Sequence, residues 1–221
     1  MIEAWQFVIR NPEQMVEWTL EHLWVTFIAC SIAVILGVPL GIYITDKGKE
    51  QIADAVLYLA EITMTIPSLA IFGFLMFILA AIGLPSIGFT PAVIALIIYA
   101  QLPILRNTYV AIRQVDPAMI EAGKGMGMSE RQLLFRVKLP LSVPVIMAGL
   151  RTAIVMTIAI ATIAAVIGFG GLGQAIWWGI RGARMDLIIA GGVSVAILGL
   201  LTDIFLSRVQ RWVTPKGLKE M

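Results

Sequence analysis

The sequence predicts an all-α, polytopic membrane protein with five transmembrane helices, and three observations lead to this fold class. Hydrophobic residues make up 59% of the 221 residues, and the mean hydropathy is +0.92. Charged residues make up only 14%, whereas ordinary soluble domains carry roughly 25%. The apolar residues also gather in long runs, each reaching the roughly 20 residues that a helix needs to cross a membrane. We therefore expect the protein to be surrounded by lipid.

The apolar runs follow one another with short polar or turn-rich breaks between them. The first run contains no charged residue and stops at a polar cluster that begins with Asp46. Turn-forming residues between Gly83 and Pro91 separate the second run from the third. Pro67 in the second span and Pro103 in the third are each expected to kink their helix. The predicted spans are 23–44, 54–82, 92–112, 141–167 and 187–207.

Lysine and arginine residues gather in alternate loops, and this asymmetry predicts the orientation of the chain. Eleven of the 16 basic residues fall in one set of segments, and three fall in the alternating set. Because basic loops stay in the cytoplasm, the N-terminus is predicted outside and the C-terminus in the cytoplasm. The basic set is 45–53, 113–140 and 208–221, and the other set is 1–22, 83–91 and 168–186.

The domain organisation follows from these spans. We expect an external N-terminal segment at 1–22 and a short cytoplasmic tail at 216–221. Between them, 23–215 forms a single transmembrane domain that includes a cytoplasmic loop at 113–140.

The composition excludes several classes of function. The sequence contains one cysteine, Cys30, and one histidine, His22. We therefore do not expect an intrachain disulfide, a Cys/His metal cage or a usual nucleophile–base pair. A net charge of +2 without an aromatic-interleaved basic stripe argues against nucleic-acid binding. The mixed polar start of the chain does not resemble a cleavable signal peptide. No phosphate-binding Gly-x-x-x-x-Gly-Lys-Ser/Thr loop is present.

The loop 113–140 is the only sizeable polar segment between spans, and its pattern predicts two short helices. Asp116 and Pro117 are typical of a helix start, with Asp as N-cap and Pro at the first helical position. A glycine elbow at Gly125 and Gly127 follows, and a second helix is expected from Ser129 to about Val137, with Pro140 ending it.

Within this loop lies a motif that resembles the EAA signature of ABC importer permeases. The family pattern is Glu-Ala-Ala, three residues, Gly, nine residues and Ile-x-Leu-Pro. Gly123 stands in place of the second alanine and Val137 in place of the isoleucine, and both departures are small. The positions that match the pattern at the required offsets are Glu121, Ala122, Gly127, Leu139 and Pro140.

The resemblance covers essentially the whole chain and implies a permease subunit of the type I, MetI-like fold. It implies that the loop docks on an ATP-binding subunit through Glu121, Ala122, Gly123, Gly127, Leu139 and Pro140. The implied partners are two ATP-binding subunits, a second permease chain, identical or paralogous, and an extracytoplasmic substrate-binding protein. ATP and Mg would bind to the ATPase, so no cofactor and no catalytic residue is assigned to this chain. The alternative for the loop is an amphipathic helix resting on the membrane surface.

Two further stretches resemble the osmoprotectant permeases, which import glycine betaine, choline, carnitine or related quaternary amines. They are 65–70 (Thr-Ile-Pro-Ser-Leu-Ala) and 168–173 (Gly-Phe-Gly-Gly-Leu-Gly). The second also resembles the methionine permeases, so a permease for methionine or another amino acid remains the alternative. Trp177 and Trp178 follow it and are expected in an interfacial aromatic belt, or else as a cation–π surface for a quaternary ammonium group.

A few side chains inside or near the spans are candidates for the transport pathway or its gate: Glu61, Pro67, Arg106, Arg151 and Phe169. Ionisable groups are costly in lipid and usually face the protein interior. Glu61 therefore has two candidate ion-pair partners, Arg106 and Arg151, and such a pair would hold an inner gate or the helix bundle together. The alternatives are snorkelling to the interface and, for Glu61, an anionic site for the cationic substrate. Asp203 and Arg208 are expected at the interface.

Two rival functions lie outside this class. A membrane-embedded enzyme would need polar catalytic groups converging within the spans, and the sequence lacks them there. A secondary transporter usually shows internal repeats and more spans. Neither rival matches a chain with five spans and a coupling-like loop.

Overall fold

The computed structural model describes residues 2–214, and within them every regular element is a helix. The predicted all-α class is thus confirmed, while the tail at 216–221, with Lys216 and Lys219, lies outside the described residues. The elements are α1 (Ile2–Arg10), α2 (Pro12–Tyr43), α3 (Glu50–Thr65), α4 (Ser68–Ala81), α5 (Phe89–Arg113), α6 (Pro117–Gly125), α7 (Glu130–Leu133), a π-helical turn (Leu134–Lys138), α8 (Leu139–Ala161), a 3-10 turn (Thr162–Ile167), α9 (Gly173–Arg181) and α10 (Met185–Val213).

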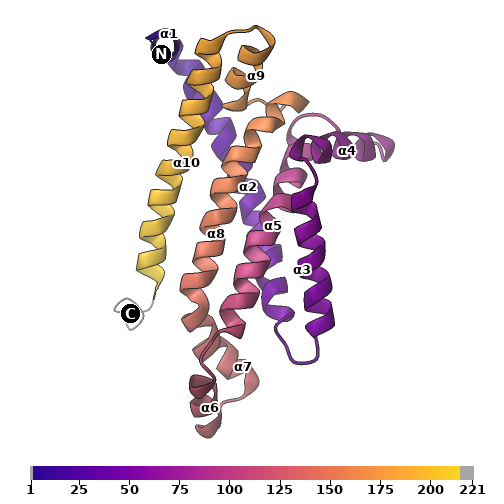
Figure 1. Cartoon of the computed structure of the whole chain (residues 1–221), viewed down its shortest axis with the longest axis vertical. Coiled ribbons are helices and arrows are strands. Elements are labelled where there is room, and N and C mark those ends of the chain that lie inside the picture. The colour runs from indigo at the N-terminus through magenta and orange to yellow at the C-terminus, as the bar shows by residue number, and fades with distance from the viewer. Residues whose placement is uncertain (1, 215–221) are drawn as a thin grey trace.

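Four long helices, α2, α5, α8 and α10, run lengthwise through the molecule (Figure 1). Helix α5 packs against both α2 and α8, and α10 packs against α8 and α9. Helices α6 and α7 lie at one end of the bundle, and α1 and α9 lie at the other (Figure 1). We call these the α6 end and the α9 end.

Small residues allow α2, α5 and α8 to approach closely. Glycines face the neighbouring helix where an added Cβ would collide: at Gly37 it would lie 2.8 Å from Ile104 Cγ2, and at Gly41 2.8 Å from Thr108 Cβ. Alanines fill the rest of this contact. Because lipid and Leu are equally apolar, such close backbone packing is what favours association of membrane helices. The fully buried alanines here are Ala29, Ala33, Ala92, Ala95, Ala100 and Ala153.

The predicted second span is bent instead of straight. Helices α3 and α4 meet at Ile66 and Pro67 at an angle of 103°, far more than the expected kink. Pro67 is extended and caps α4, and the hydroxyl of Tyr99 on α5 donates to the carbonyl of Ile66 at 2.6 Å. At 1.5 Å per residue the 16 residues of α3 extend only about 24 Å. The five predicted spans are therefore four straight helices plus this broken pair.

The start of the first span also differs from the prediction. The helix that contains the first span begins at Pro12 instead of Leu23, because α2 runs for 32 residues without a break. Residues 2–22 are therefore α1 followed by the first part of α2. Helix α5 continues through Pro103, and the side chain of Asn107 donates to the carbonyl of Pro103 at 2.8 Å.

Candidate functional site

The α6 end carries the segment in which the sequence predicts a docking site, and the residues fold there as a compact unit. Helix α6 begins as expected: the carboxylate of Asp116 accepts a hydrogen bond from the backbone N–H of Ala118 at 2.8 Å. Helix α7 begins with a reciprocal capping box between Ser129 and Gln132. Lys124 and Glu130 also form an exposed ion pair across the elbow, with Nζ and Oε1 3.6 Å apart.

The elbow between α6 and α7 depends on two glycines with different roles. Gly127 has a φ of +77° with open space around it, so its role is the left-handed turn. Gly123 is buried, and a Cβ there would lie 2.5 Å from Cδ2 of the fully buried Leu133. Gly123 therefore packs inside the unit, against α7, and does not present a bare backbone to a partner.

The second short helix does not end at Pro140, contrary to the prediction. Helix α7 continues through the π turn into α8, and the helix runs without interruption from Glu130 to Ile167. In the π turn the N–H of Leu139 donates to the carbonyl of Leu134, five residues back. This wider turn interrupts the α-helical bonding just before Pro140, so the missing N–H and the bulk of the proline ring do not break the helix. Leu139 and Pro140 are thus the start of α8.

The outer surface of the α6–α7 unit is exposed and mixed in character. Glu121 and Ala122 are exposed on α6. Met119 and Met126 are exposed there as well, Met126 to 70%. Figure 1 shows α6 at the tip of the molecule, so these residues form an exposed surface that is suited to contact with another protein. We call this surface, made of Met119, Glu121, Ala122 and Met126, the α6 surface.

Glu61 and Arg106, two of the predicted pathway residues, form an ion pair between α3 and α5. Nη1 of Arg106 lies 2.8 Å from Oε1 of Glu61. Both side chains are about half exposed, 60% for Arg106 and 46% for Glu61. This is one of the two pairings considered from the sequence. Its role as a gate stays a prediction.

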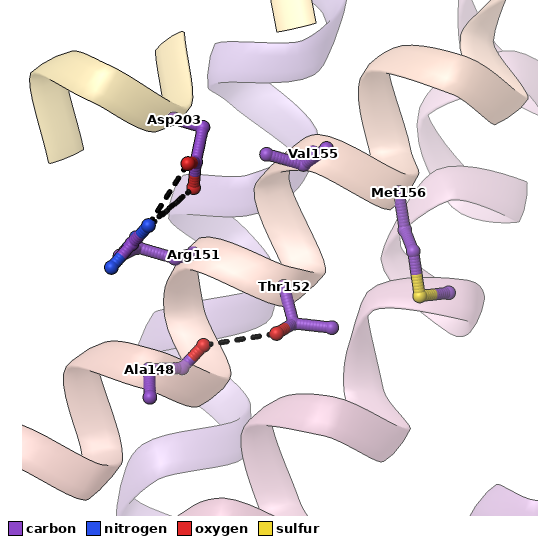
Figure 2. A pocket seen from close by; sticks show the side chains of 6 residues that line it. All are labelled: Ala148, Arg151, Thr152, Val155, Met156 and Asp203. Atoms are coloured by element: carbon purple, nitrogen blue, oxygen red, sulfur yellow. Dashed lines mark hydrogen bonds and ion pairs between the residues drawn. The ribbon is translucent and has the colours of Figure 1, made fainter. Parts of the chain in front are cut away.

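Arg151 does not pair with Glu61, and its actual partners were missed. It projects from α8 toward α10, where Nη2 lies 2.8 Å from Oδ1 and 2.9 Å from Oδ2 of Asp203 (Figure 2). Its Nη1 also donates to Oε1 of Gln210 at 3.0 Å. Asp203 was predicted only to lie at the interface. The signal in the sequence was one acid and one base in separate spans, without any indication of which helices are neighbours.

At the α9 end, the glycine-rich stretch 168–173 follows the 3-10 turn, and α9 starts at its last residue. Gly168, Gly170 and Gly171 have φ values of +79°, +104° and +67°. The N–H of Gly171 donates to Oε2 of Glu21 on α2 at 2.8 Å. Next to Glu21, the fully buried His22 has its Nε2 2.9 Å from the carbonyl oxygen of Ile158 on α8.

The sequence does not point to Glu21, and it points to His22 only as the single histidine, because both residues precede the first apolar run. Phe169, predicted as a pathway residue, packs at the α9 end with its ring 6.1 Å from that of Phe89. Trp178 packs edge-on against Trp18, with ring centroids 5.4 Å apart. The predicted pathway residues therefore lie at several separate places in the molecule.

Among the described residues, no cluster of His, Cys, Asp and Glu has an arrangement suited to a metal ion. The polar features instead join helices to one another or face outward at the two ends.

The sequence matches a known family over most of its length. Residues 37–216 match the family described as binding-protein-dependent transport system inner membrane component. The osmoprotectant import permease protein OsmW of Salmonella typhimurium is 41% identical over 213 residues, which cover 96% of this chain and 98% of OsmW. The glycine betaine/carnitine/choline transport system permease protein OpuCB of Bacillus subtilis is also 41% identical, over 100% of this chain and 98% of OpuCB. The choline transport system permease protein OpuBB of the same organism is 40% identical, over 98% of this chain and 96% of OpuBB.

Solved structures agree with this family. In an inward-facing crystal form of the MetNI methionine ABC transporter, one chain superposes with a TM-score of 0.78 at 26% identity, covering 93% of this chain and 99% of that one. A chain of an amino acid ABC transporter has the same fold, with a TM-score of 0.78 at 22% identity. This chain therefore belongs to the family of binding-protein-dependent transport system inner membrane components: it is a permease subunit of an ABC importer in the inner membrane, and it works with a separate ATPase and a substrate-binding protein.

Proposed function

We propose that this chain is the permease of an ATP-driven importer for osmoprotectants, namely glycine betaine, choline, carnitine or related quaternary amines. The observation that carries this proposal is the identity of about 41% over essentially the whole chain to permeases named for these compounds. The methionine transporter shares the fold at 26% identity, which is a more distant likeness. Import of methionine or another amino acid is therefore the alternative.

Coupling to ATP hydrolysis takes place at the α6 surface. The exposed Glu121 and Ala122 lie on a short helix at the tip of the bundle, and the left-handed Gly127 sets the direction in which the chain returns. Exposed apolar side chains at Met119 and Met126 supply area for a protein contact. The ATPase carries ATP and Mg, and this chain binds neither.

We assign the α6 end to the cytoplasm and the α9 end to the outside. Figure 1 places the α2–α3 loop, the α6–α7 unit and the described end of α10 toward one end. Nine described basic residues lie in the loop segments at this end, which are 45–53, 113–140 and the described part of 208–221. Three, Arg10, Arg181 and Arg184, lie in the segments at the α9 end. The positive-inside rule therefore supports this orientation.

The full importer contains two permease chains, two ATPase copies and an external binding protein. A single bundle of four straight helices and one broken pair has many apolar residues on its surface and no enclosed channel among its described cavities. A pathway between two such chains accounts for the half-exposed ion pair of Glu61 and Arg106, because charged groups seldom face lipid.

The test is transport by the reconstituted complex. The chain is expressed with its neighbouring ATPase and binding protein, placed in liposomes, and assayed for ATP-dependent uptake of labelled glycine betaine with methionine as competitor. We expect uptake that methionine does not reduce. Uptake of methionine in place of glycine betaine would contradict the proposed substrate, and failure of any ATPase to copurify would contradict the proposed coupling.

A matched pair of glycine variants tests the coupling surface. Gly127 and Gly48 both have positive φ, +77° and +82°, and an added Cβ meets no atom within 4 Å at either position. Gly127→Ala and Gly48→Ala therefore introduce the same backbone strain, but only Gly127 lies in the α6–α7 unit. We expect Gly127→Ala to lower uptake and ATPase association while Gly48→Ala leaves both near the wild-type level. Equal losses in the two variants would contradict docking through this elbow.

A further inference from the structure

A single helix connects the α6–α7 unit with the opposite end of the molecule. From Glu130 to Ile167 it contains 38 residues, which corresponds to roughly 57 Å at 1.5 Å per residue. The whole bilayer, with headgroups, is about 40–45 Å thick. A displacement applied to α7 is thus carried along α8 through the membrane.

Helix α10 is less firmly attached to the bundle than α8. Only 22% of the most apolar window of α10 is buried within the chain, against 39% for the Glu130–Ile167 helix that contains α8. An apolar groove of about 740 Å³ separates the α6-end half of α10 from α2. Its walls carry Phe27 and Val34 of α2 and Leu201 and Phe205 of α10, and its floor includes Ile154 of α8. The α6-end half of α10 therefore depends on α8 for its attachment.

A polar network supplies that attachment. The guanidinium group of Arg151 holds the carboxylate of Asp203 through Nε at 3.0 Å and through Nη2 at 2.8 Å (Figure 2). Gln210 lies two turns further along α10, accepts from Nη1 of Arg151, and donates from Nε2 to the carbonyl of Pro144 at 2.9 Å. The network thus holds two turns of α10 against two turns of α8. A bidentate guanidinium–carboxylate pair fixes orientation as well as distance.

At the α9 end, α10 packs against α9 with almost no free space. A Cβ on Gly191 would lie 2.8 Å from Ile176 Cγ1, and a Cβ on Gly179 would lie 2.6 Å from Ile188 Cγ1. Helix α9 in turn follows the glycine-rich stretch that Glu21 binds. A movement of α10 is therefore transmitted to the surface at the α9 end.

We propose that Arg151, Asp203 and Gln210 are positioning residues that make α10 move with α8, so that a displacement of the α6–α7 unit reaches α9 and the external surface. This inference rests on the proposed function, because it assumes an ATPase at the α6 surface and a binding protein at the α9 end. The role of the network is to keep hydrolysis on one side of the membrane matched to transport across it.

The experiment measures substrate uptake per ATP hydrolysed and the stimulation of ATPase activity by the binding protein, both with the full complex in liposomes. The variants are Asp203→Asn, Arg151→Lys, and the double variant Arg151→Met/Asp203→Leu. The double variant replaces the ion pair with apolar contacts, which often restores or improves stability without the fixed orientation. We expect Asp203→Asn and the double variant to lower uptake per ATP by between about twofold and thirtyfold, with Arg151→Lys between them and wild type.

Lys49→Gln is the matched control. Lys49 forms an ion pair with Asp46, with Nζ and Oδ2 2.6 Å apart, but the two residues lie three apart in the α2–α3 loop and the pair joins no two helices. We expect this variant to keep the wild-type ratio of uptake to hydrolysis.

The outcomes separate this inference from the proposed function. If the wild-type complex shows no ATP-driven uptake that the binding protein stimulates, both the proposed function and the positioning role are wrong. If wild type transports and the Asp203→Asn and double variants keep its uptake per ATP, the proposed function stands and the positioning role is wrong. A double variant that restores yield and the uptake ratio together would also overturn the inference, since the network would then serve stability alone.

Discussion

Gly149 marks a very close approach between α5 and α8, and Gly149→Ala is expected to destabilise the protein. The added Cβ would lie 2.7 Å from the carbonyl oxygen of Pro103, would collide with Cβ of Asn107, and would lie 2.8 Å from Cγ of Asn107. Ordinary contact begins at 3.4 Å, so the contact with Pro103 alone requires a separation of roughly 0.7 Å, and the closer contact with Asn107 Cβ requires more. The carbonyl oxygen and the Asn107 Cβ belong to the helix framework and cannot rotate away.

The cost follows from the packing that this separation disturbs. Inserting one methyl group into a well-packed core typically costs about 1–3 kcal/mol, and each kcal/mol lowers the melting temperature of a chain of this size by about 2–4 °C. The measurement is thermal unfolding of the purified complex in detergent. Unfolding is monitored as the loss of the monodisperse species with rising temperature. We expect Gly149→Ala to melt several degrees below wild type.

Gly192→Ala provides the comparison. Gly192 also lies within a long helix, α10, but a Cβ there meets no atom within 4 Å. Alanine is the better helix former by about 1 kcal/mol in water, so this variant should be neutral or slightly stabilised. If Gly149→Ala and Gly192→Ala melted at the same temperature, the reasoning from close helix approach would be refuted.

Three further predictions concern other contacts. Glu61→Gln and Arg106→Gln are each expected to change the free energy of unfolding by no more than about 1 kcal/mol, because ion pairs this exposed contribute little. Thermal unfolding checks this prediction, and a loss above about 3 kcal/mol would indicate a buried pair instead. Glu21→Gln weakens a charge-assisted hydrogen bond to the N–H of Gly171 and should speed proteolysis at the glycine-rich stretch 168–173. An unchanged rate of cleavage would show that Glu21 does not hold this stretch in place. Leu133→Ala removes a fully buried side chain and should cost about 2–5 kcal/mol, seen as faster hydrogen exchange in α6; unaltered exchange would show that α6 does not depend on α7.

The helical class and the division into spans follow from the sequence, because lipid imposes one requirement on every span, about 20 apolar residues. The bend at Ile66 and Pro67 does not follow from it. A proline predicts a break in bonding, but the angle depends on contacts such as the hydroxyl of Tyr99, which lies 33 residues further along the chain. Pro140 likewise predicts a helix end, but the π turn before it lets the helix continue.

The α6–α7 unit was largely predictable because its signals are local. Asp116, Ser129 and Gly127 act on residues within a few positions of themselves, and the capping bonds and left-handed turn form as their types indicate. The partners of Arg151 were not predictable in this way. Asp203 lies 52 residues away, and only the packing of α8 against α10 brings the two together.

The broken pair α3–α4 also bears on how the protein reaches the membrane. Helix α3 has only 16 residues and carries Glu50, Asp54 and Glu61. On its own, α3 would therefore insert into the membrane inefficiently. In the folded chain α3 packs against α5, which also supplies the hydroxyl of Tyr99 for the carbonyl at the bend. During synthesis, α5 emerges after α3 and α4. We therefore expect the second span to reach its final position only after the third is in place.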